Sequence, residues 1–205
     1  MRPIASAFAA LLALLSPASA GAASLTYKRP VPAPDPAAQL AEMVALFNEI
    51  CLKAFPDDAA VARAMAARQA TAMTAAEVKV YLHEDPGAGW DIAGRSAPFA
   101  LTVEAPPFHA CGVRTTAVAP FADMAPYRHL ADGFEAGRQV QRIGPVNGTI
   151  GNVDTSGGGD MWKRPDGKDE ALLVFIATPV ARLRAQGEDA VQIRFVHQLV
   201  DPPSH

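Results

Sequence analysis

Concentrated positive charge is scarce in this sequence of 205 residues. It has 18 Lys and Arg residues against 21 Asp and Glu residues, a formal net charge of −3 at pH 7. No extended run of Lys or Arg occurs in it. Nucleic acids and anionic lipid surfaces are bound through concentrated basic patches. The composition therefore argues against both as partners and indicates a mildly acidic surface.

A long hydrophobic segment is also missing. The apolar run from Ile4 to Leu15 is about a dozen residues, whereas a membrane-spanning helix needs about 20. It follows Met1 and Arg2 and precedes Ala18-Ser19-Ala20, the small-x-small pattern after which signal peptidases cut. We therefore expect a signal peptide over residues 1–20, no stable membrane insertion, and a periplasmic or secreted protein.

Cysteine is limited to Cys51 and Cys111. Two cysteines in an oxidising compartment pair in only one way, so the export signal predicts a disulfide between them. On the chain-entropy model, a link between positions 60 apart stabilises the fold by about 4 kcal/mol. A pair of reactive or metal-binding thiols is the alternative, and it suits a reducing compartment better.

The usual motifs of catalysis and phosphate binding are absent. The glycine run of Ser156–Asp160 is not followed by Gly-Lys-Ser or Gly-Lys-Thr, so we interpret it as a flexible loop between strands. No serine stands in a G-x-S-x-G turn, and no two histidines have the spacing H-x-x-x-H. The sequence predicts no catalytic residue, no metal site and no cofactor.

Three residues remain as candidates for ligand binding: Trp90, His109 and Trp162. Exposed tryptophans line apolar grooves, and a half-buried histidine adds a polar group to such a groove. The alternative is an acid/base or metal site in which His83 and His109 act with acidic neighbours such as Glu84.

The beginning of the mature chain is proline-rich. Residues 21–36 include Pro30, Pro32, Pro34 and Pro36, which favour an extended tether. Residues 37–205 are enough for a single domain. Asp35 is the expected N-cap of a helix that ends near Phe55, before Pro56. The apolar positions of this helix share one face: Leu40, Met43, Val44, Phe47, Ile50, Cys51 and Ala54.

Two further helices are expected before the first strands. One follows Pro56 and is capped by Asp57 or Asp58, and the next begins at the capping box Thr74–Glu77. Another helix is predicted in mid-chain, from Met124 to Gln139, because apolar residues return there to helical spacing.

Strands are predicted wherever apolar residues alternate with polar ones, around Phe99–Val103, His109–Val113 and Val191–Leu199. Asn147-Gly148 predicts one hairpin turn, and Pro165-Asp166-Gly167 predicts a second. Hairpin-linked strands with helices before and between them indicate the α+β class. We expect an antiparallel sheet with the N-terminal helices and the mid-chain helix on one face, held by one disulfide.

The order of these features resembles a family of uncharacterised exported proteobacterial proteins. The likeness covers Leu46 to Arg114. It includes Phe47-x-x-x-Cys51 with Pro56 soon after, then Gly89-Trp90, then Pro106-Pro107-Phe108-His109-Ala110-Cys111-Gly112-Val113-Arg114. The resemblance implies a periplasmic or secreted domain in which Cys51 is joined to Cys111, and it implies no activity.

The leading hypothesis for function is a non-enzymatic periplasmic or secreted domain that binds an envelope protein or a small apolar ligand. The alternative is a small hydrolase or metal-dependent enzyme that uses His83, His109 and acidic neighbours. An inhibitor or immunity-type protein, which only occludes another surface, is a third hypothesis. The sequence leaves the oligomeric state open.

Overall fold

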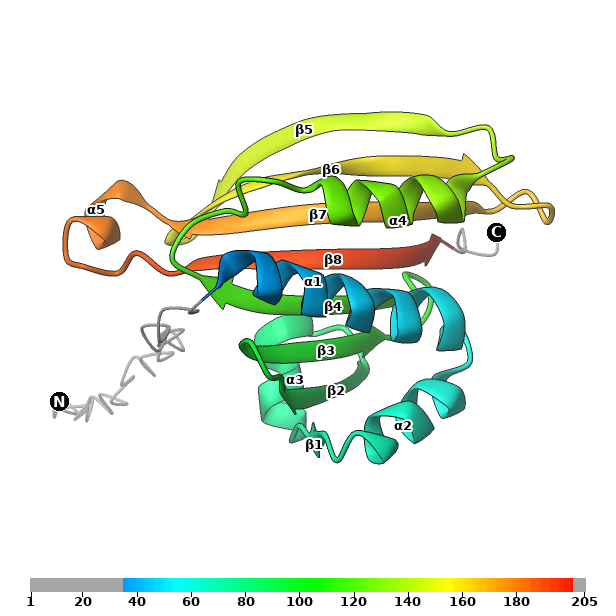
Figure 1. Ribbon diagram of the computed structural model, residues 1–205, viewed down its shortest axis with the longest axis horizontal. Coiled ribbons are helices and arrows are strands. Elements are labelled where there is room, and N and C mark those ends of the chain that lie inside the picture. Colours follow the sequence, from blue (N-terminus) through cyan, green and yellow to red (C-terminus); the bar gives the residue numbers. More distant parts are fainter. Residues whose placement is uncertain (1–34, 201–205) are drawn as a thin grey trace, which may run out of the picture.

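The structure is a computed structural model that describes residues 35–200. The expected signal peptide and nearly all of the expected tether lie outside these residues. The described chain forms helices around one eight-stranded sheet (Figure 1). No helix within residues 35–200 is long and apolar enough to cross a membrane.

Two consecutive helical segments open the described chain. α1 (Pro36–Leu46) begins at the predicted cap, where the Asp35 side chain accepts a hydrogen bond from the backbone N–H of Ala37. It continues directly into η1 (Phe47–Ala54), which has π-helical geometry. The predicted helix is therefore confirmed in extent, but its second half is wider than an α-helix.

Two shorter helices follow, and both begin at predicted caps. In α2 (Asp58–Ala67) the Asp57 side chain accepts from the N–H of Ala60. In α3 (Ala75–Leu82) Thr74 and Glu77 form the predicted capping box. The predicted mid-chain helix is α4 (Ala125–Glu135). It ends earlier than expected because Ala136 is extended and Gly137 has a φ of +83°.

The sheet is antiparallel throughout, with the strand order β1-β2-β3-β4-β8-β7-β6-β5. The last strand therefore lies in the middle, between β4 and β7. The strands are β1 (Thr71–Ala72), β2 (Gly87–Ala93), β3 (Pro98–Glu104), β4 (Ala110–Ala117), β5 (Gln141–Ile150), β6 (Val153–Lys163), β7 (Asp169–Pro179) and β8 (Val191–Val200).

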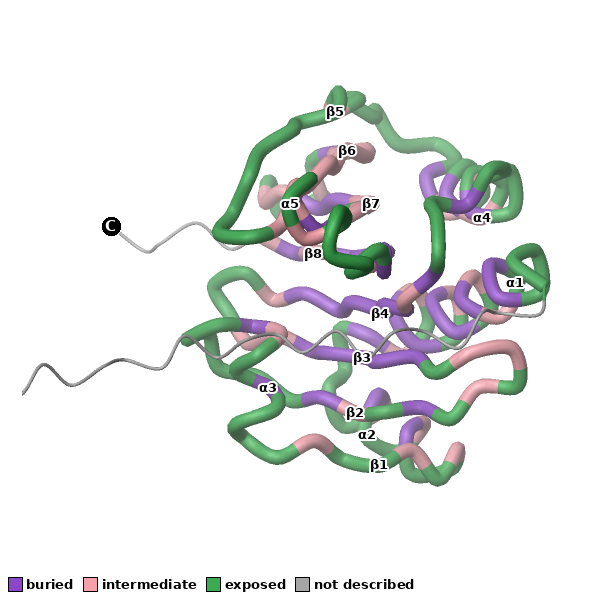
Figure 2. Tube along the Cα trace, turned by 90° about the vertical axis from the view of Figure 1, so that its left-hand side faces the viewer, coloured by how far each residue is buried: buried purple, intermediate pink, exposed green. Residues whose placement is uncertain are grey.

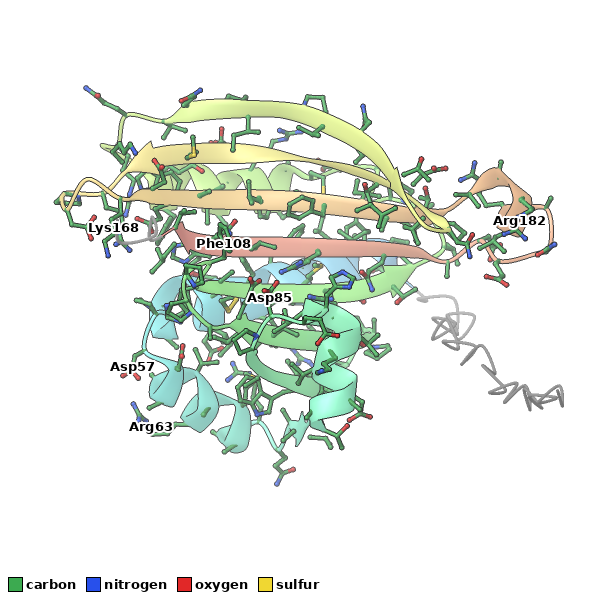
Figure 3. All side chains as sticks on the ribbon, turned by 180° about the vertical axis from the view of Figure 1, so that it is seen from behind. Asp57, Arg63, Asp85, Phe108, Lys168 and Arg182 are labelled. Atoms are coloured by element: carbon green, nitrogen blue, oxygen red, sulfur yellow. A yellow bond between two sulfur atoms is a disulfide. The ribbon has the colours of Figure 1, made fainter. Side chains whose placement is uncertain are left out.

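The antiparallel sheet with helices before and between its strands confirms the α+β class. The helices do not all share one face as expected, because α3 lies on the opposite face from α1, η1 and α4. α1, η1 and α4 cover the face seen in Figure 1, here called the front face. α3 crosses the opposite, back face over β2 and β3 (Figure 3). A Cβ atom on Gly89 would lie 2.6 Å from the Met73 sulfur and 3.4 Å from Val78, so this glycine allows α3 to pack closely. A short helix, α5 (Ala181–Arg184), links β7 to β8.

The main core lies between the front helices and the sheet. Its fully buried side chains come from α1, η1, α2 and strands β3, β4, β7 and β8. The largest of them are Phe47, Phe195, Met43, Ile50, Met65, Leu101, Leu172 and Ile193.

The prediction of a hairpin turn at Asn147-Gly148 is wrong. β5 runs straight through these residues, and Asn147 pairs with Ser156. The chain turns three residues later, at Gly151, which has a φ of +60°. This glycine occupies a left-handed position that Asn-Gly would otherwise have supplied. The second predicted hairpin is confirmed, because Lys163 pairs with Asp169 across Pro165–Gly167.

The interpretation of Ser156–Asp160 as a loop is also wrong, because the segment lies inside β6. A Cβ on Gly157 would lie 2.4 Å from the Phe175 ring, and one on Gly159 would lie 1.9 Å from the carbonyl oxygen of Leu172. The glycines are there because the neighbouring strand and an aromatic ring come too close for any side chain.

Candidate functional site

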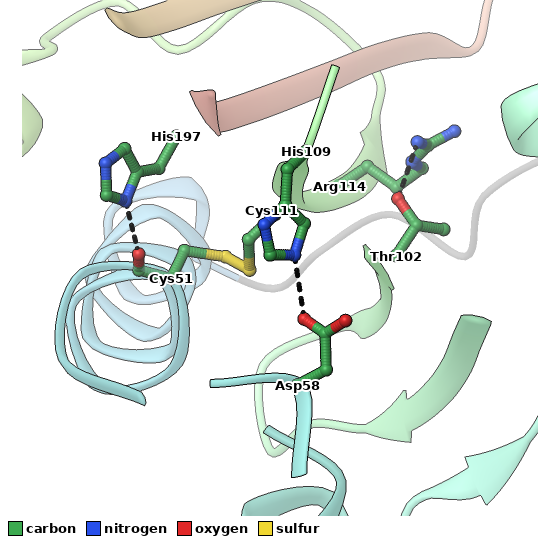
Figure 4. Close-up of a disulfide and its surroundings, with 7 residues drawn as sticks. All are labelled: Cys51, Asp58, Thr102, His109, Cys111, Arg114 and His197. Carbon is green, nitrogen blue, oxygen red and sulfur yellow. Dashed lines mark hydrogen bonds and ion pairs between the residues drawn. A yellow bond between two sulfur atoms is a disulfide. The ribbon is translucent and has the colours of Figure 1, made fainter. Parts of the chain in front are cut away.

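The predicted disulfide is present and joins the front helices to the sheet. Cys51 of η1 and Cys111 of β4 are bonded, with their Cα atoms 5.3 Å apart. Both residues are fully buried. Figure 4 shows the bond with His197 near Cys51 and His109 near Cys111.

His197 of β8 contacts the backbone of Cys51. Its Nδ1 atom lies 2.6 Å from the carbonyl oxygen of Cys51. In η1 the N–H of Phe55 bonds to the carbonyl of Ile50, five residues earlier. The corresponding partner of the Cys51 carbonyl would be residue 56, but Pro56 has no N–H. The imidazole therefore satisfies a buried carbonyl that the helix leaves without a donor.

The other nitrogen of His197 meets a carboxylate. Nε2 lies 2.7 Å from one oxygen of Glu170, and the second oxygen of Glu170 accepts from the Trp162 indole N–H at 3.0 Å. A carbonyl only accepts hydrogen bonds, so Nδ1 must carry a proton. Nε2 and Glu170 form the second contact of the ring, so both imidazole nitrogens have buried partners.

The pKa of Glu170 lies below its ordinary value of 4.5. Burial acts to raise this pKa, but the hydrogen bond and charge of His197 and the hydrogen bond of Trp162 together outweigh it. Glu170 is thus held as a carboxylate between two donors.

Aromatic rings connect these groups into one cluster. The ring of Phe55 lies between His109 and His197, with centroids 4.5 and 5.2 Å away. The ring of Phe134 lies between His197 and Trp162, at 5.2 and 6.1 Å. We call these five residues, His109, Phe55, His197, Phe134 and Trp162, the ring cluster. Trp162 and His197 are each 3% exposed and are closed to a ligand, whereas His109 and Phe134 are half-buried.

The structure brings together two of the three predicted binding residues. His109 and Trp162 stand at the two ends of the ring cluster. Trp90 is half-buried on β2, with β3, β4, β8 and β7 between its strand and the strand of Trp162. The three side chains therefore do not line one groove.

The two histidines of the alternative enzyme site have different surroundings. His109 Nε2 is 2.9 Å from a carboxylate oxygen of Asp58, at the start of α2. His83 is exposed at the end of α3, on the other face of the sheet. Within residues 35–200, no group of three His, Cys, Asp or Glu side chains has the arrangement to hold a metal ion.

A second group of titratable side chains lies beneath the C-terminal end of α4. Glu135 is 8% exposed, and one of its oxygens is buried without a hydrogen-bond partner. Burial, followed by the charges of Asp160 and Asp132, raises its pKa to about 7. Asp160 accepts a hydrogen bond from Arg142 at 3.0 Å. One carboxyl therefore favours its proton next to another that is ion-paired.

The sequence did not predict the contact between Glu170 and His197, nor the separate buried carboxyl of Glu135. Each looks ordinary in its own segment, because His197 simply alternates along a strand and Glu170 stands at the beginning of one. Only the strand order, which inserts β8 beside β7, brings Glu170 to His197.

The open surface offers a hollow of about 560 Å³ on the front face of β5, β6 and β7. Its lining combines the polar side chains of Asn147, Thr149, Asp154, Ser156 and Thr178 with apolar surface that includes Pro120 and Ile176. A second hollow of about 500 Å³ lies beside α1, where Glu42 already accepts hydrogen bonds from Arg95 and Ser96. Neither hollow is lined by Trp90, His109 or Trp162.

Beside the first hollow, β5 forms a free edge of the sheet. It pairs with β6 only, and all its residues except Ile143 are exposed (Figure 2). Val146 is 69% exposed and Ile150 is 70% exposed. The opposite edge is the two-residue β1, so β5 is the long free edge among the described strands.

Comparison with known proteins identifies no relative: no family model, no curated protein and no solved structure matches this chain.

Proposed function

We propose that this chain is a non-enzymatic periplasmic or secreted binding domain that takes up an extended segment of an envelope protein along β5. The observation that carries the proposal is the exposed outer strand on a scaffold held by the buried disulfide. Sheet edges of this kind bind peptides by adding a strand, in which backbone hydrogen bonds supply affinity. The disulfide and the absence of a spanning helix in residues 35–200 fit an exported protein.

The backbone of β5 supports pairing with another strand. Only Gly151 and Asn152 separate the paired residues Ile150 and Val153. In such a two-residue hairpin the flanking pair is hydrogen-bonded, and bonded pairs alternate with unbonded ones along the ladder. The N–H and C=O groups of Asn147 and Thr149 then point away from β6 and are available to a partner strand.

The side chains of β5 define what the partner segment should carry. Residues 143–150 contain no charged side chain. Val146 and Ile150 lie on the back face, whereas Asn147 and Thr149 lie on the front face and line the hollow. Cross-strand neighbours pair best apolar with apolar and hydroxyl with hydroxyl. We therefore expect an uncharged segment in which apolar residues alternate with Ser, Thr or Asn.

A protein segment is a better occupant than a small apolar ligand. The hollow beside β5 combines polar side chains with apolar surface, and Trp162, which would have supplied an aromatic wall, is buried. An extended segment can use both kinds of surface, because its backbone forms hydrogen bonds with the strand edge and its side chains fill the adjacent hollow. The bulge between Ile143 and Val146 limits the available edge to Val146–Ile150.

The test uses a nine-residue peptide of alternating valine and threonine with a charged solubilising tail, and measures its dissociation constant by fluorescence anisotropy. Asn147→Pro removes an outward N–H and should weaken binding at least tenfold, because proline is tolerated at a strand edge but cannot donate. Asn147→Ala keeps this N–H and is the matched control. Equal binding by wild type and Asn147→Pro would contradict the proposal.

A further inference from the structure

Two arginines stand directly opposite each other on the back face of the sheet. Arg114 of β4 pairs with Arg194 of β8. α3 covers β2 and β3 on this side, while no helix crosses β8, β7 or β6 there (Figure 3). The two side chains therefore lie at the border between the covered and the open part of the back face.

Arg114 is held in place on the covered side. It is 5% exposed. Its guanidinium carbon lies 4.4 Å from the centre of the Tyr81 ring of α3, and one of its nitrogens donates to the Thr102 hydroxyl at 3.1 Å. The charge of Arg114 is thus fixed at one position beneath the helix.

Arg194 lies flat over the backbone of β4. A Cβ atom on Gly112 would be 3.0 Å from the Arg194 Nε and 3.4 Å from one of its terminal nitrogens, so the glycine leaves room for the guanidinium. The Nε atom is buried without a hydrogen-bond partner. The charge of Glu104 acts on the pKa of Arg194, but no ion pair involves this arginine within residues 35–200.

The burial of Arg194 is electrostatically unfavourable, because a buried charge is costly unless it is compensated. Burial lowers the pKa of Arg194, and the charge of Glu104 only partly opposes this effect. A negatively charged ligand beside the Arg194 guanidinium would offset this cost, and guanidinium groups bind planar and tetrahedral oxyanions through paired N–H bonds.

We propose that Arg114 and Arg194, with Gly112 providing the space, form a binding site for an oxyanion, either a carboxylate or a phosphate group. Arg194 supplies the N–H groups of a half-buried guanidinium, and Arg114 adds fixed positive charge from the neighbouring strand. The site lies on the back face, whereas the proposed peptide edge is β5, so either proposal stands without the other.

Nitrogen-15 NMR of the arginine Nε–Hε groups tests this site on the intact protein. The probes are sodium phosphate and sodium acetate, each titrated against sodium chloride at constant ionic strength. The expected result is a saturable shift of the Arg194 Nε–Hε resonance. Saturation by phosphate alone identifies a phosphate ligand, and saturation by acetate identifies a carboxylate. A resonance that neither anion moves beyond the chloride control would overturn the proposal.

Variants separate the site from general charge effects. Arg194→Gln should weaken anion binding at least tenfold, measured as the anion-dependent rise in melting temperature. Arg63→Gln is the matched control, because Arg63 is exposed and carries the same charge. An equal loss in both variants would also overturn the proposal, because it would show binding to net charge. The NMR titration of wild type decides the question should Arg194→Gln fail to fold.

Discussion

Glu170 holds together a buried chain of hydrogen bonds that runs from Trp162 through His197 to the Cys51 carbonyl. Its two carboxylate oxygens serve two different donors, the Trp162 indole and the His197 ring. His197 in turn covers the Cys51 carbonyl that Pro56 leaves without a donor. One carboxylate therefore organises a chain of contacts from β6 to η1, and its removal affects every member.

We predict that Glu170→Ala lowers the free energy of unfolding by about 3–5 kcal/mol, because it breaks the buried His197–Glu170 pair and leaves the buried Trp162 indole N–H without its acceptor. Urea denaturation at pH 7, followed by circular dichroism, measures the change. Glu84→Ala is the control, since Glu84 forms an exposed ion pair with Lys79 and should change stability little. Similar losses of unfolding free energy in the two variants would show that the buried contacts of Glu170 stabilise the fold no more than an exposed ion pair does.

Glu135 should make stability depend on pH. Its pKa is about 7 in the folded protein against an ordinary 4.5, so the folded state holds a proton that the unfolded state has released between these values. Its contribution to stability therefore falls as pH rises from 4.5 to 7 and is constant above pH 7.

Replacing this group by a neutral isostere should remove that dependence. We predict that Glu135→Gln gains stability relative to wild type as pH rises from 4.5 to 7. Urea denaturation at a series of pH values measures the difference. Glu188→Gln, at an exposed position, is the control and should follow wild type. A constant difference between Glu135→Gln and wild type across this range would refute the assignment.

At this scale the sequence predicted the residues whose chemistry is local. Two cysteines in an oxidising compartment have only one pairing, and the predicted Cys51–Cys111 disulfide is confirmed. His197 and Glu170 could not be predicted as partners, because 27 residues separate them and their contact depends on which strands become neighbours.

At the scale of elements, the sequence left the positions of turns and strand interiors ambiguous. Asn147-Gly148 and Gly151-Asn152 are competing turn signals only a few residues apart. The pairing of β5 with the glycine run of β6 selects the second. The starts of α1, α2 and α3 were predicted correctly because caps act within one turn. The π-helical form of η1, which packs against β4 and β8, was not predicted.

The glycine run of β6 yields a prediction for this element. Gly159→Ala should lower the free energy of unfolding by about 1–3 kcal/mol or more, because its Cβ would lie 1.9 Å from the Leu172 carbonyl oxygen and must force β6 and β7 apart. Gly148→Ala in β5 is the matched control, since its Cβ would meet only the Thr155 hydroxyl at 3.9 Å. Thermal denaturation compares the two. Equal melting temperatures would mean that β6 does not need this glycine.

At the scale of the whole molecule, the disulfide is the covalent link between the helical layer and the sheet. It closes a loop between positions 60 apart, so replacing both cysteines by alanine should lower the free energy of unfolding by about 4 kcal/mol. Urea denaturation with and without reductant measures this loss. Reductant should destabilise wild type similarly and leave the double variant unchanged. A wild type indifferent to reductant would contradict the role of the bond.

The same scaffold presents β5 at its outer edge. The central strands β4, β8 and β7 each have a hydrogen-bonded neighbour on both sides, whereas β5 has a neighbour on one side only. The proposed function requires the outward N–H groups of Asn147 and Thr149 to gain partners when an extended segment binds.

Hydrogen exchange of individual β5 amides, measured by NMR with and without the alternating valine–threonine peptide, tests this claim most directly. We predict that the peptide slows exchange at Asn147 and Thr149 at least tenfold and leaves Val146 and Gly148, which face β6, nearly unchanged. Asn147→Ala should retain the protection at Thr149. Unchanged exchange at both outward amides under saturating peptide, or slowing elsewhere in the sheet without them, would contradict binding at this edge.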